Sequence, residues 1–290
     1  MISKYIRLIR PIAWITFFLP FSVGFGLGVN QNSNPIHMIF AFLAFVFWMS
    51  FCFILNALSD KNVDEYHNGR SKDMNLIFQP LLTGEITSKT AINISIIFLL
   101  LSLIFGWLIN VQFFLLILII DIIGYIYSMP PLRLKSKPLG DILCNAFAAV
   151  NIFSAGLNIG GENMNIFLVI SIFLMATVFY IPTVVTDYEF DKKAGLKTSA
   201  VFFGPKKILS SMYPLTILSI IFWLSIFMSP KIELKVLSIL CIIYSIIFTL
   251  ASNLKLKKDR LYLHENWILI PFLFISFGFI IYGFLKFIGM

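Results

Sequence analysis

Polar and acidic residues follow directly after a long apolar segment near the N-terminal end of the chain. Residues 36–55 are mostly Phe, Ile, Leu, Ala, Met and Trp, and Asn56, Asp60 and Asp64 come next. In a continuing helix, each four-residue step turns the side chain only ~40° further around the axis, so these three side chains form one stripe. Carboxylate and amide oxygens are ligands of Mg²⁺, which usually also binds substrate phosphates. The stripe therefore predicts a magnesium and phosphate site, and the competing interpretation is a solvated helix end.

A second pair of carboxylates has the same spacing and the same context. Asp187 and Asp191 are four residues apart and directly follow the apolar segment from Ile166 to Val185. Similar chemical groups therefore follow two separate hydrophobic helices. This repetition favours the metal site over the solvated helix end.

The elements that must position these groups are membrane helices. The 290 residues are 59% hydrophobic and 12% charged, with a mean hydropathy of +0.92, which is unlike the composition of a soluble domain. A helix that crosses a bilayer needs roughly 20 apolar residues. The predicted spans are 12–29, 36–57, 91–109, 112–129, 141–159, 165–187, 208–228, 232–252 and 266–287. We expect an all-α, polytopic membrane protein with nine spans and a single domain over residues 1–290.

Basic residues are divided unequally between the two sides of such a chain. Of the 22 Lys and Arg, only Lys231, Lys235 and Lys286 fall on the side opposite the N-terminus. Cytoplasmic loops contain an excess of Lys and Arg, so we expect a cell-membrane protein with its N-terminus and both acidic motifs in the cytoplasm. The net charge of +8 then reflects topology and attraction to anionic membrane lipid, and it indicates no nucleic-acid-binding surface.

A basic segment follows the fourth predicted span. Its residues are Tyr127, Ser128, Met129, Pro130, Pro131, Leu132, Arg133, Leu134 and Lys135. The prolines end the helix, and the Arg and Lys side chains that follow can bind an anion. Carboxylates that bind Mg²⁺, together with Arg and Lys, imply a polyanionic substrate, most simply a diphosphate. Since the spans are aliphatic and aromatic, we expect a diphosphate with a long hydrocarbon tail, that is, a prenyl diphosphate.

At these residues the chain resembles the UbiA superfamily of intramembrane prenyltransferases, over nearly its whole length. The matching elements are the first acidic motif, the segment from Tyr127 to Lys135, and the second acidic motif with Gly195, Lys197 and Thr198. The resemblance implies helices around a central cavity that opens sideways to lipid, with Mg²⁺ ions held between the two motifs and the diphosphate. Two positions depart from the family pattern. Many members have Asp where this chain has Ala57, and many have Arg where it has Gln79, so one phosphate contact is expected to fall to Arg70 or Lys72.

The resemblance and the side-chain chemistry together imply a role for each candidate residue. The expected Mg²⁺ ligands are Asn56, Asp60, Asp64, Asp187 and Asp191, and their four carboxylates are the expected catalytic groups. The expected diphosphate-binding residues, whose cations offset the charge on the leaving group, are Arg70, Lys72, Tyr127, Arg133, Lys135 and Lys197. After the C–O bond breaks, aromatic faces would hold the allylic cation while a carbon of a lipophilic acceptor attacks it. We expect Asp191 to orient that acceptor or to accept its proton.

Three functions remain open at this stage. They are prenyl transfer to a separate acceptor (an aromatic molecule, a polar lipid or an isoprenoid chain), cyclisation of the prenyl tail as in a UbiA-type terpene cyclase, and ion-coupled transport. The position of most carboxylates at the cytoplasmic mouth, among basic loops, argues against transport. Asp121 is an exception because it lies inside an apolar span. Such a group normally faces a protein interior, and pairing with Asn145 or Asn151 explains it as well as a functional role does.

Overall fold

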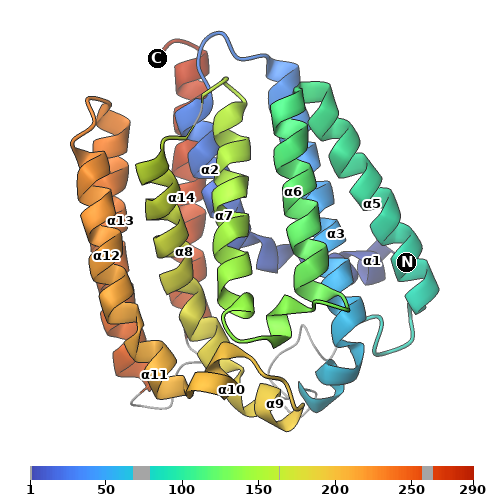
Figure 1. Cartoon of the computed structure of the whole chain (residues 1–290). Coiled ribbons are helices and arrows are strands. Elements are labelled where there is room, and N and C mark those ends of the chain that lie inside the picture. Colours follow the sequence, from blue (N-terminus) through green and yellow to red (C-terminus); the bar gives the residue numbers. More distant parts are fainter. Residues whose placement is uncertain (1, 68–78, 163, 257–263) are drawn as a thin grey trace. The chain divides into compact units, whose positions relative to one another are not determined.

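The structure is a computed structural model that describes residues 2–67, 79–162, 164–256 and 264–290. Every regular element among these residues is a helix (Figure 1). The α-helices are α1 (Ile2–Ile9), α2 (Ile15–Gly28), α3 (Pro35–His67), α5 (Ser88–Ile109), α6 (Val111–Ser128), α7 (Gly140–Asn158), α8 (Ile166–Thr186), α9 (Tyr188–Lys193), α10 (Ser199–Phe203), α11 (Pro205–Ser210), α12 (Met212–Phe227), α13 (Ile232–Leu256) and α14 (His264–Phe287). Two short 3₁₀ helices are η1 (Pro11–Trp14) and η2 (Leu134–Ser136).

These helices agree with the predicted membrane spans. Within the described residues, eight segments are long and apolar enough to cross a membrane, and Pro271–Phe287 is a shorter apolar helix. The predicted count of nine is therefore approximately matched. The second predicted span lies inside α3, which continues to His67, so Asn56, Asp60 and Asp64 belong to one helix as expected.

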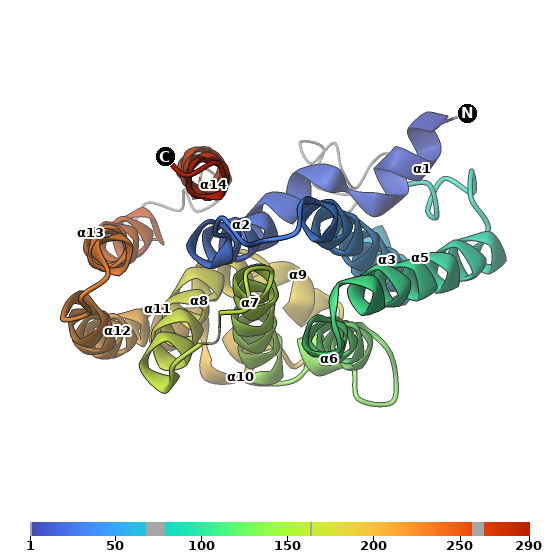
Figure 2. The same ribbon diagram turned by 90° about the horizontal axis from the view of Figure 1, so that it is seen from above.

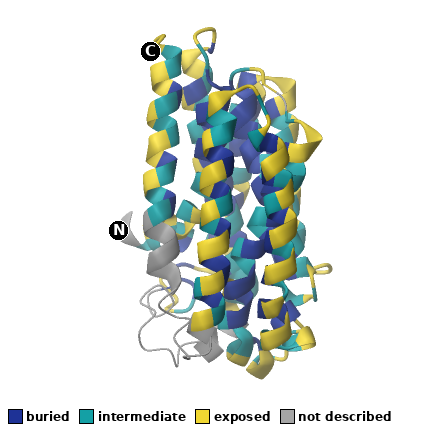
Figure 3. Cartoon of the chain, turned by 90° about the vertical axis from the view of Figure 1, so that its left-hand side faces the viewer, coloured by how far each residue is buried: buried dark blue, intermediate teal, exposed yellow. Residues whose placement is uncertain are grey.

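Apolar side chains occupy the exposed faces of the long helices as well as the buried ones. On α5, Ile96, Leu100, Ile104 and Trp107 are each about half exposed. Figure 3 shows exposed and buried residues on the same long helices. In water, this much exposed apolar surface would promote aggregation, whereas in a bilayer it contacts lipid tails. The burial pattern therefore agrees with the membrane assignment made from hydropathy.

The chain divides into two compact units, which are described one at a time. Unit 1 comprises Met1–Arg133, Asn151–Glu162 and Ile275–Met290, and unit 2 comprises Leu134–Val150 and Asn163–Phe274. Helices α7 and α14 each contribute residues to both units. The expectation that residues 1–290 form one domain stays a prediction.

In unit 1, glycines on α2 allow close backbone contact with two other helices. A Cβ atom on Gly24 would collide with the carbonyl oxygen of Phe153, and one on Gly28 with that of Leu157, both in the last turns of α7. A Cβ on Gly283 of α14 would press on the ring of Phe25 in α2. Small residues are common at such contacts because helix association in lipid depends on close van der Waals packing.

The two ends of α3 lie beside different parts of unit 1. Near its start, the Lys286 Nζ of α14 donates a hydrogen bond to the Leu27 carbonyl oxygen at 2.9 Å. Beyond its end, in the connection to α5, Glu85 pairs with Arg7 of α1. Helix α1 and the C-terminal end of α14 therefore lie at opposite ends of α3.

Helices α3, α5 and α6 pack together in unit 1 around a buried carboxyl group. The Ser102 Oγ of α5 donates a hydrogen bond to Asp121 Oδ2 at 3.0 Å, and the other carboxyl oxygen of Asp121 is buried without a partner. Asp121 therefore pairs with the preceding span. Of the two interpretations left open for Asp121, pairing with a polar neighbour is observed, and the neighbour is Ser102 of the preceding span where Asn145 or Asn151 had been suggested.

Unit 2 is built around α8. Its apolar core is formed by residues of α7, α8, α10, α11, α12 and α13, and includes Ile142, Val178, Ile181, Val184, Val185, Ala200, Ile208, Leu209, Met212 and Phe248. Four rings, Phe179, Tyr244, Phe248 and Phe272, pack together, with the Phe179 and Phe248 centroids 4.7 Å apart. The core therefore extends to the end of α8, from which the second acidic motif continues.

Candidate functional site

The first acidic motif occupies the last turns of α3 in unit 1. Asn56 and Asp60 lie one helical turn apart on the same face, and both are partly exposed. Asp64 is on the same helix, although its side chain lies outside what the structure describes. An amide oxygen and a carboxylate thus lie side by side where the apolar part of α3 ends.

Arg133 reaches this motif from the segment that follows α6. Its Nη2 donates to the Ser59 carbonyl oxygen at 3.0 Å and to Asp60 Oδ1 at 3.2 Å. The backbone of Arg133 is in the left-handed region, with φ of 39°, and its N–H donates to the Met129 carbonyl oxygen. This turn aims the guanidinium back at the end of α3. A residue predicted to bind diphosphate and a residue predicted to bind metal are therefore in direct contact.

The second acidic motif lies in unit 2, where α8 meets α9. Asp187 is the residue between the two helices, and the Asp191 N–H donates to the Asp187 carbonyl oxygen at 2.9 Å, so the helical spacing of the pair is preserved. Asp191 is buried, and its Oδ2 accepts a hydrogen bond from Thr198 Oγ1 at 3.0 Å. Its orientation is therefore fixed, while Asp187 remains partly exposed.

A buried hydrogen-bond cluster in unit 2 links the two basic segments. Asp141, in the first turn of α7, accepts hydrogen bonds from both the backbone N–H and the hydroxyl of Ser199. The same hydroxyl accepts from the Leu139 N–H at 2.7 Å. Ser199 directly follows Thr198, so the segment that contains Lys135 is tied to the segment that holds Asp191. Lys135 is partly exposed and Lys197 is exposed.

Sequence reasoning overlooked Asp141 and Ser199. The available signal was an acidic residue at the start of a predicted span, a position where a carboxylate either caps a helix or binds a partner from another segment. Tyr127 is partly exposed in the last turn of α6. Arg70 and Lys72 lie outside the described residues, so their predicted role is untested.

The donor atoms of the two motifs fit Mg²⁺. Each motif presents hard oxygen ligands at a helix end, and Mg²⁺ is usually bound through one or two carboxylates, with water and phosphate completing its coordination. Among the residues that the structure describes, no three His, Cys, Asp or Glu side chains gather into a metal site. The expectation that the two motifs share one diphosphate stays a prediction.

A comparison with protein families identifies the chain. The model of the UbiA prenyltransferase family matches residues 17–278. The chain belongs to the UbiA prenyltransferase family. A solved structure of a UbiA homologue from Archaeoglobus fulgidus, bound to DMAPP and Mg²⁺, is 49% identical and has a TM-score of 0.94, with 99% of this chain and 100% of that chain covered.

Two relatives of this UbiA chain have names that refer to different compounds. A digeranylgeranylglyceryl phosphate synthase from Methanosphaera stadtmanae is 25% identical over 251 residues, which cover 86% of this chain and 84% of that protein. A 4-hydroxybenzoate octaprenyltransferase from Legionella pneumophila is 26% identical over 211 residues, or 70% of each chain. UbiA membership confirms the predicted fold class and prenyltransferase activity, and it decides against the transporter alternative.

Proposed function

We propose that this UbiA-family prenyltransferase moves an isoprenyl group from a prenyl diphosphate to a lipophilic acceptor and releases diphosphate in a Mg²⁺-dependent reaction. The main observation in support is the contact of the Arg133 guanidinium with Asp60, which joins an anion-binding group to a metal-binding group at the end of an apolar helix. The 49% identical Archaeoglobus fulgidus homologue is bound to DMAPP and Mg²⁺, a ligand pair that matches these groups.

In the proposed site, the oxygens of Asn56, Asp60, Asp64, Asp187 and Asp191 hold Mg²⁺. When bound there, Mg²⁺ supplies positive charge that favours departure of the diphosphate. The chain itself adds fixed cations for the same purpose, namely Arg133, Lys135 and Lys197, with Arg70 and Lys72 from the loop after α3. The Tyr127 hydroxyl can donate to a phosphate oxygen. These groups bind the diphosphate and orient its C–O bond.

The chain must then protect the prenyl cation from water. Once the C–O bond breaks, its electron pair leaves with the diphosphate and the allylic carbon becomes positive. Aromatic faces attract a cation with about 2 kcal/mol or more when it is desolvated, without donating a nucleophile. The Phe and Tyr rings that line the helices supply such faces, and most of them also serve packing.

Attack by the acceptor forms the new bond to carbon and releases a proton. Asp191 is our candidate for orienting the acceptor or receiving that proton. The hydrogen bond from Thr198 Oγ1 to its Oδ2 fixes the orientation of this carboxylate. A carboxylate held in this way acts as a base only if it lies within hydrogen-bond reach of the acceptor.

We further propose that the site opens to the cytoplasm in the cell membrane. The support is the excess of Lys and Arg in the loops on the side of the N-terminus and the acidic motifs. The proposed acceptor is a molecule that enters from the lipid phase. The names of the two relatives above give two acceptor classes to test, a glyceryl phosphate lipid and an aromatic acid.

The test is a diphosphate-release assay on the purified full chain in lipid nanodiscs. The donor is geranylgeranyl diphosphate with Mg²⁺, supplied alone, with an isoprenyl glyceryl phosphate, or with 4-hydroxybenzoate. The Asp60→Asn variant is the inactive control, and Lys137→Gln, which removes an exposed charge near the site, is the matched active control.

Release that requires both Mg²⁺ and one acceptor supports the proposal and identifies the acceptor class. Release of the same size without any acceptor indicates cyclisation or hydrolysis and overturns the acceptor transfer. Full release in the presence of a chelator overturns the metal assignment.

A further inference from the structure

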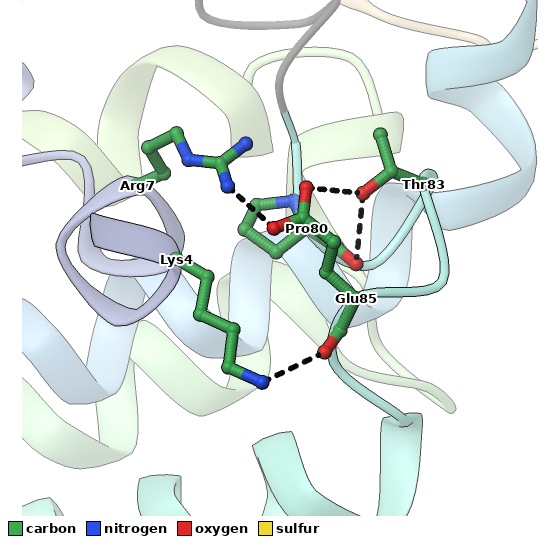
Figure 4. A network of polar contacts seen from close by, with 5 residues as sticks. All are labelled: Lys4, Arg7, Pro80, Thr83 and Glu85. Atoms are coloured by element: carbon green, nitrogen blue, oxygen red, sulfur yellow. Dashed lines mark hydrogen bonds and ion pairs between the residues drawn. The ribbon is translucent and has the colours of Figure 1, made fainter. Parts of the chain in front are cut away.

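A polar network joins the N-terminal helix α1 to the turn that precedes α5 (Figure 4). Arg7 Nη2 donates to Glu85 Oε2 at 2.6 Å, and Lys4 Nζ donates to the Glu85 carbonyl oxygen at 3.2 Å. Thr83 Oγ1 donates to Glu85 Oε1 at 3.0 Å. The hydrogen bond from Arg7 lowers the pKa of Glu85, so this carboxylate remains charged at neutral pH. Both of its oxygens are thus used in the network.

The turn that contains Glu85 is held by its own backbone hydrogen bonds. The N–H groups of Leu82 and Thr83 donate to the Gln79 carbonyl oxygen, and the Ile86 N–H donates to that of Pro80. Gly84 supplies the positive φ, 74°, that lets the chain reverse. Glu85 is therefore presented to α1 from a well-defined turn, not from an irregular loop.

Beneath this network, α1 and the turn share an apolar cluster with α3. Leu8 of α1 is completely buried. The cluster around it consists of Leu8, Ile54, Ala57, Leu81, Ile86 and Ala91. Ile54 and Ala57 flank Asn56 in the sequence, so α1 and the turn contact α3 at the level of the first acidic motif.

We propose that Arg7 and Glu85 are positioning residues for the first acidic motif. Their ion pair holds α1 and the turn together against α3, which fixes the direction in which Asn56 and Asp60 face the diphosphate. Helix α1 lies crosswise to α2 (Figure 2) and exposes Tyr5 and Ile6, as a helix at the membrane surface does. The inference rests on the proposed function, because it concerns the same diphosphate site.

The expected effect is moderate, since the Arg7 and Glu85 side chains are 30% and 40% exposed. Ion pairs with this exposure contribute little to overall stability. Charge reversal replaces attraction with repulsion at the same contact, so we expect Arg7→Glu and Glu85→Arg each to weaken diphosphate binding about 3- to 10-fold. The double variant restores an ion pair in the opposite sense and should bind within about 2-fold of the unchanged protein.

The experiment is calorimetric titration of the purified full chain with inorganic pyrophosphate in the presence of Mg²⁺, with a thermal melt of each variant. Lys89→Glu is the matched control, because Lys89 is exposed in the first turn of α5 and has no role in the network. Glu85→Arg separates two explanations. Added positive charge near an anionic ligand would by itself tighten binding, whereas loss of the positioning contact weakens it.

Four results together support the inference. Both single variants bind pyrophosphate more weakly, the double variant recovers the affinity, Lys89→Glu has little effect, and the melting temperatures are similar. Tighter binding by Glu85→Arg, or no recovery in the double variant, overturns it. If either reversal prevents folding, Arg7→Lys and Glu85→Gln replace it, and unchanged binding in both then overturns the inference. If the unchanged protein binds no pyrophosphate, the proposed function itself is wrong.

Discussion

Replacing Arg133 with Gln should change metal binding and diphosphate binding in opposite directions. Arg133 Nη2 lies 3.2 Å from Asp60 Oδ1, so a metal ion that binds Asp60 must displace this cation or bind beside it. With substrate, the same guanidinium can donate to the diphosphate. Removing the guanidinium should therefore strengthen binding of the metal alone and weaken binding of the diphosphate.

The size of each effect follows from the exposure of the pair. The Arg133 and Asp60 side chains are 28% and 20% exposed, so the contact is intermediate between a surface ion pair and a buried charge-assisted hydrogen bond. A surface ion pair stabilises by ~0.2–1 kcal/mol. A hydrogen bond to a charged group contributes ~1.5–3 kcal/mol. We take ~1–2 kcal/mol for the pair, which corresponds to about 5- to 30-fold tighter metal binding in Arg133→Gln. Loss of the contact to diphosphate should cost ~1.5–3 kcal/mol, or about 10- to 100-fold in affinity.

The assay is binding of Mn²⁺, as a spectroscopic substitute for Mg²⁺, followed by electron paramagnetic resonance, and calorimetric titration with pyrophosphate. Lys137→Gln is the control, since it removes the same charge from an exposed site four residues away. If Arg133→Gln binds Mn²⁺ no more tightly than Lys137→Gln, the ion pair does not compete with the metal. If pyrophosphate affinity is also unchanged, Arg133 is outside the site and our reasoning is refuted.

Four further predictions concern the same molecule. Lys135→Ala should weaken pyrophosphate binding about 10- to 100-fold in calorimetry with an unchanged melting temperature, and an unchanged affinity would exclude Lys135 from the site. Asp60→Asn and Asp187→Asn should each abolish turnover, and their double variant should be no worse than either one because residues that act as a unit are non-additive; losses that simply add would mean that the motifs do not share a diphosphate. Single cysteines at positions 193 and 207, introduced on a Cys-free background, should react with an impermeant reagent only from the cytoplasmic side, and labelling from outside would reverse the proposed orientation. Ser102→Ala should lower stability by ~1–3 kcal/mol in a thermal melt, because it leaves the buried Asp121 without its hydrogen bond, while pyrophosphate affinity stays the same; a loss of affinity would indicate that Asp121 contributes to the site.

Several features of this protein could be predicted from sequence because they depend on local chemistry. Hydropathy predicted the spans since a helix in lipid must satisfy its own backbone and cover itself with apolar side chains, whatever its neighbours are. The spacing of Asn56, Asp60 and Asp64 predicted one helical stripe because the helix repeat is a property of the backbone alone. The same local spacing holds for Asp187 and Asp191, although a helix boundary falls at Asp187.

The partners of the buried and charged groups were decided only by the tertiary structure. The sequence left open whether Asp121 is functional or pairs with the following span, and in the structure it accepts a hydrogen bond from Ser102 of the preceding span. The contact of Arg133 with Asp60 and that of Asp141 with Ser199 join segments 73 and 58 residues apart. Which face of one helix meets which face of another depends on side-chain packing along the whole contact and on close approaches such as that at Gly24. Neither composition nor spacing contains that information, because each of these helices is apolar on nearly every side.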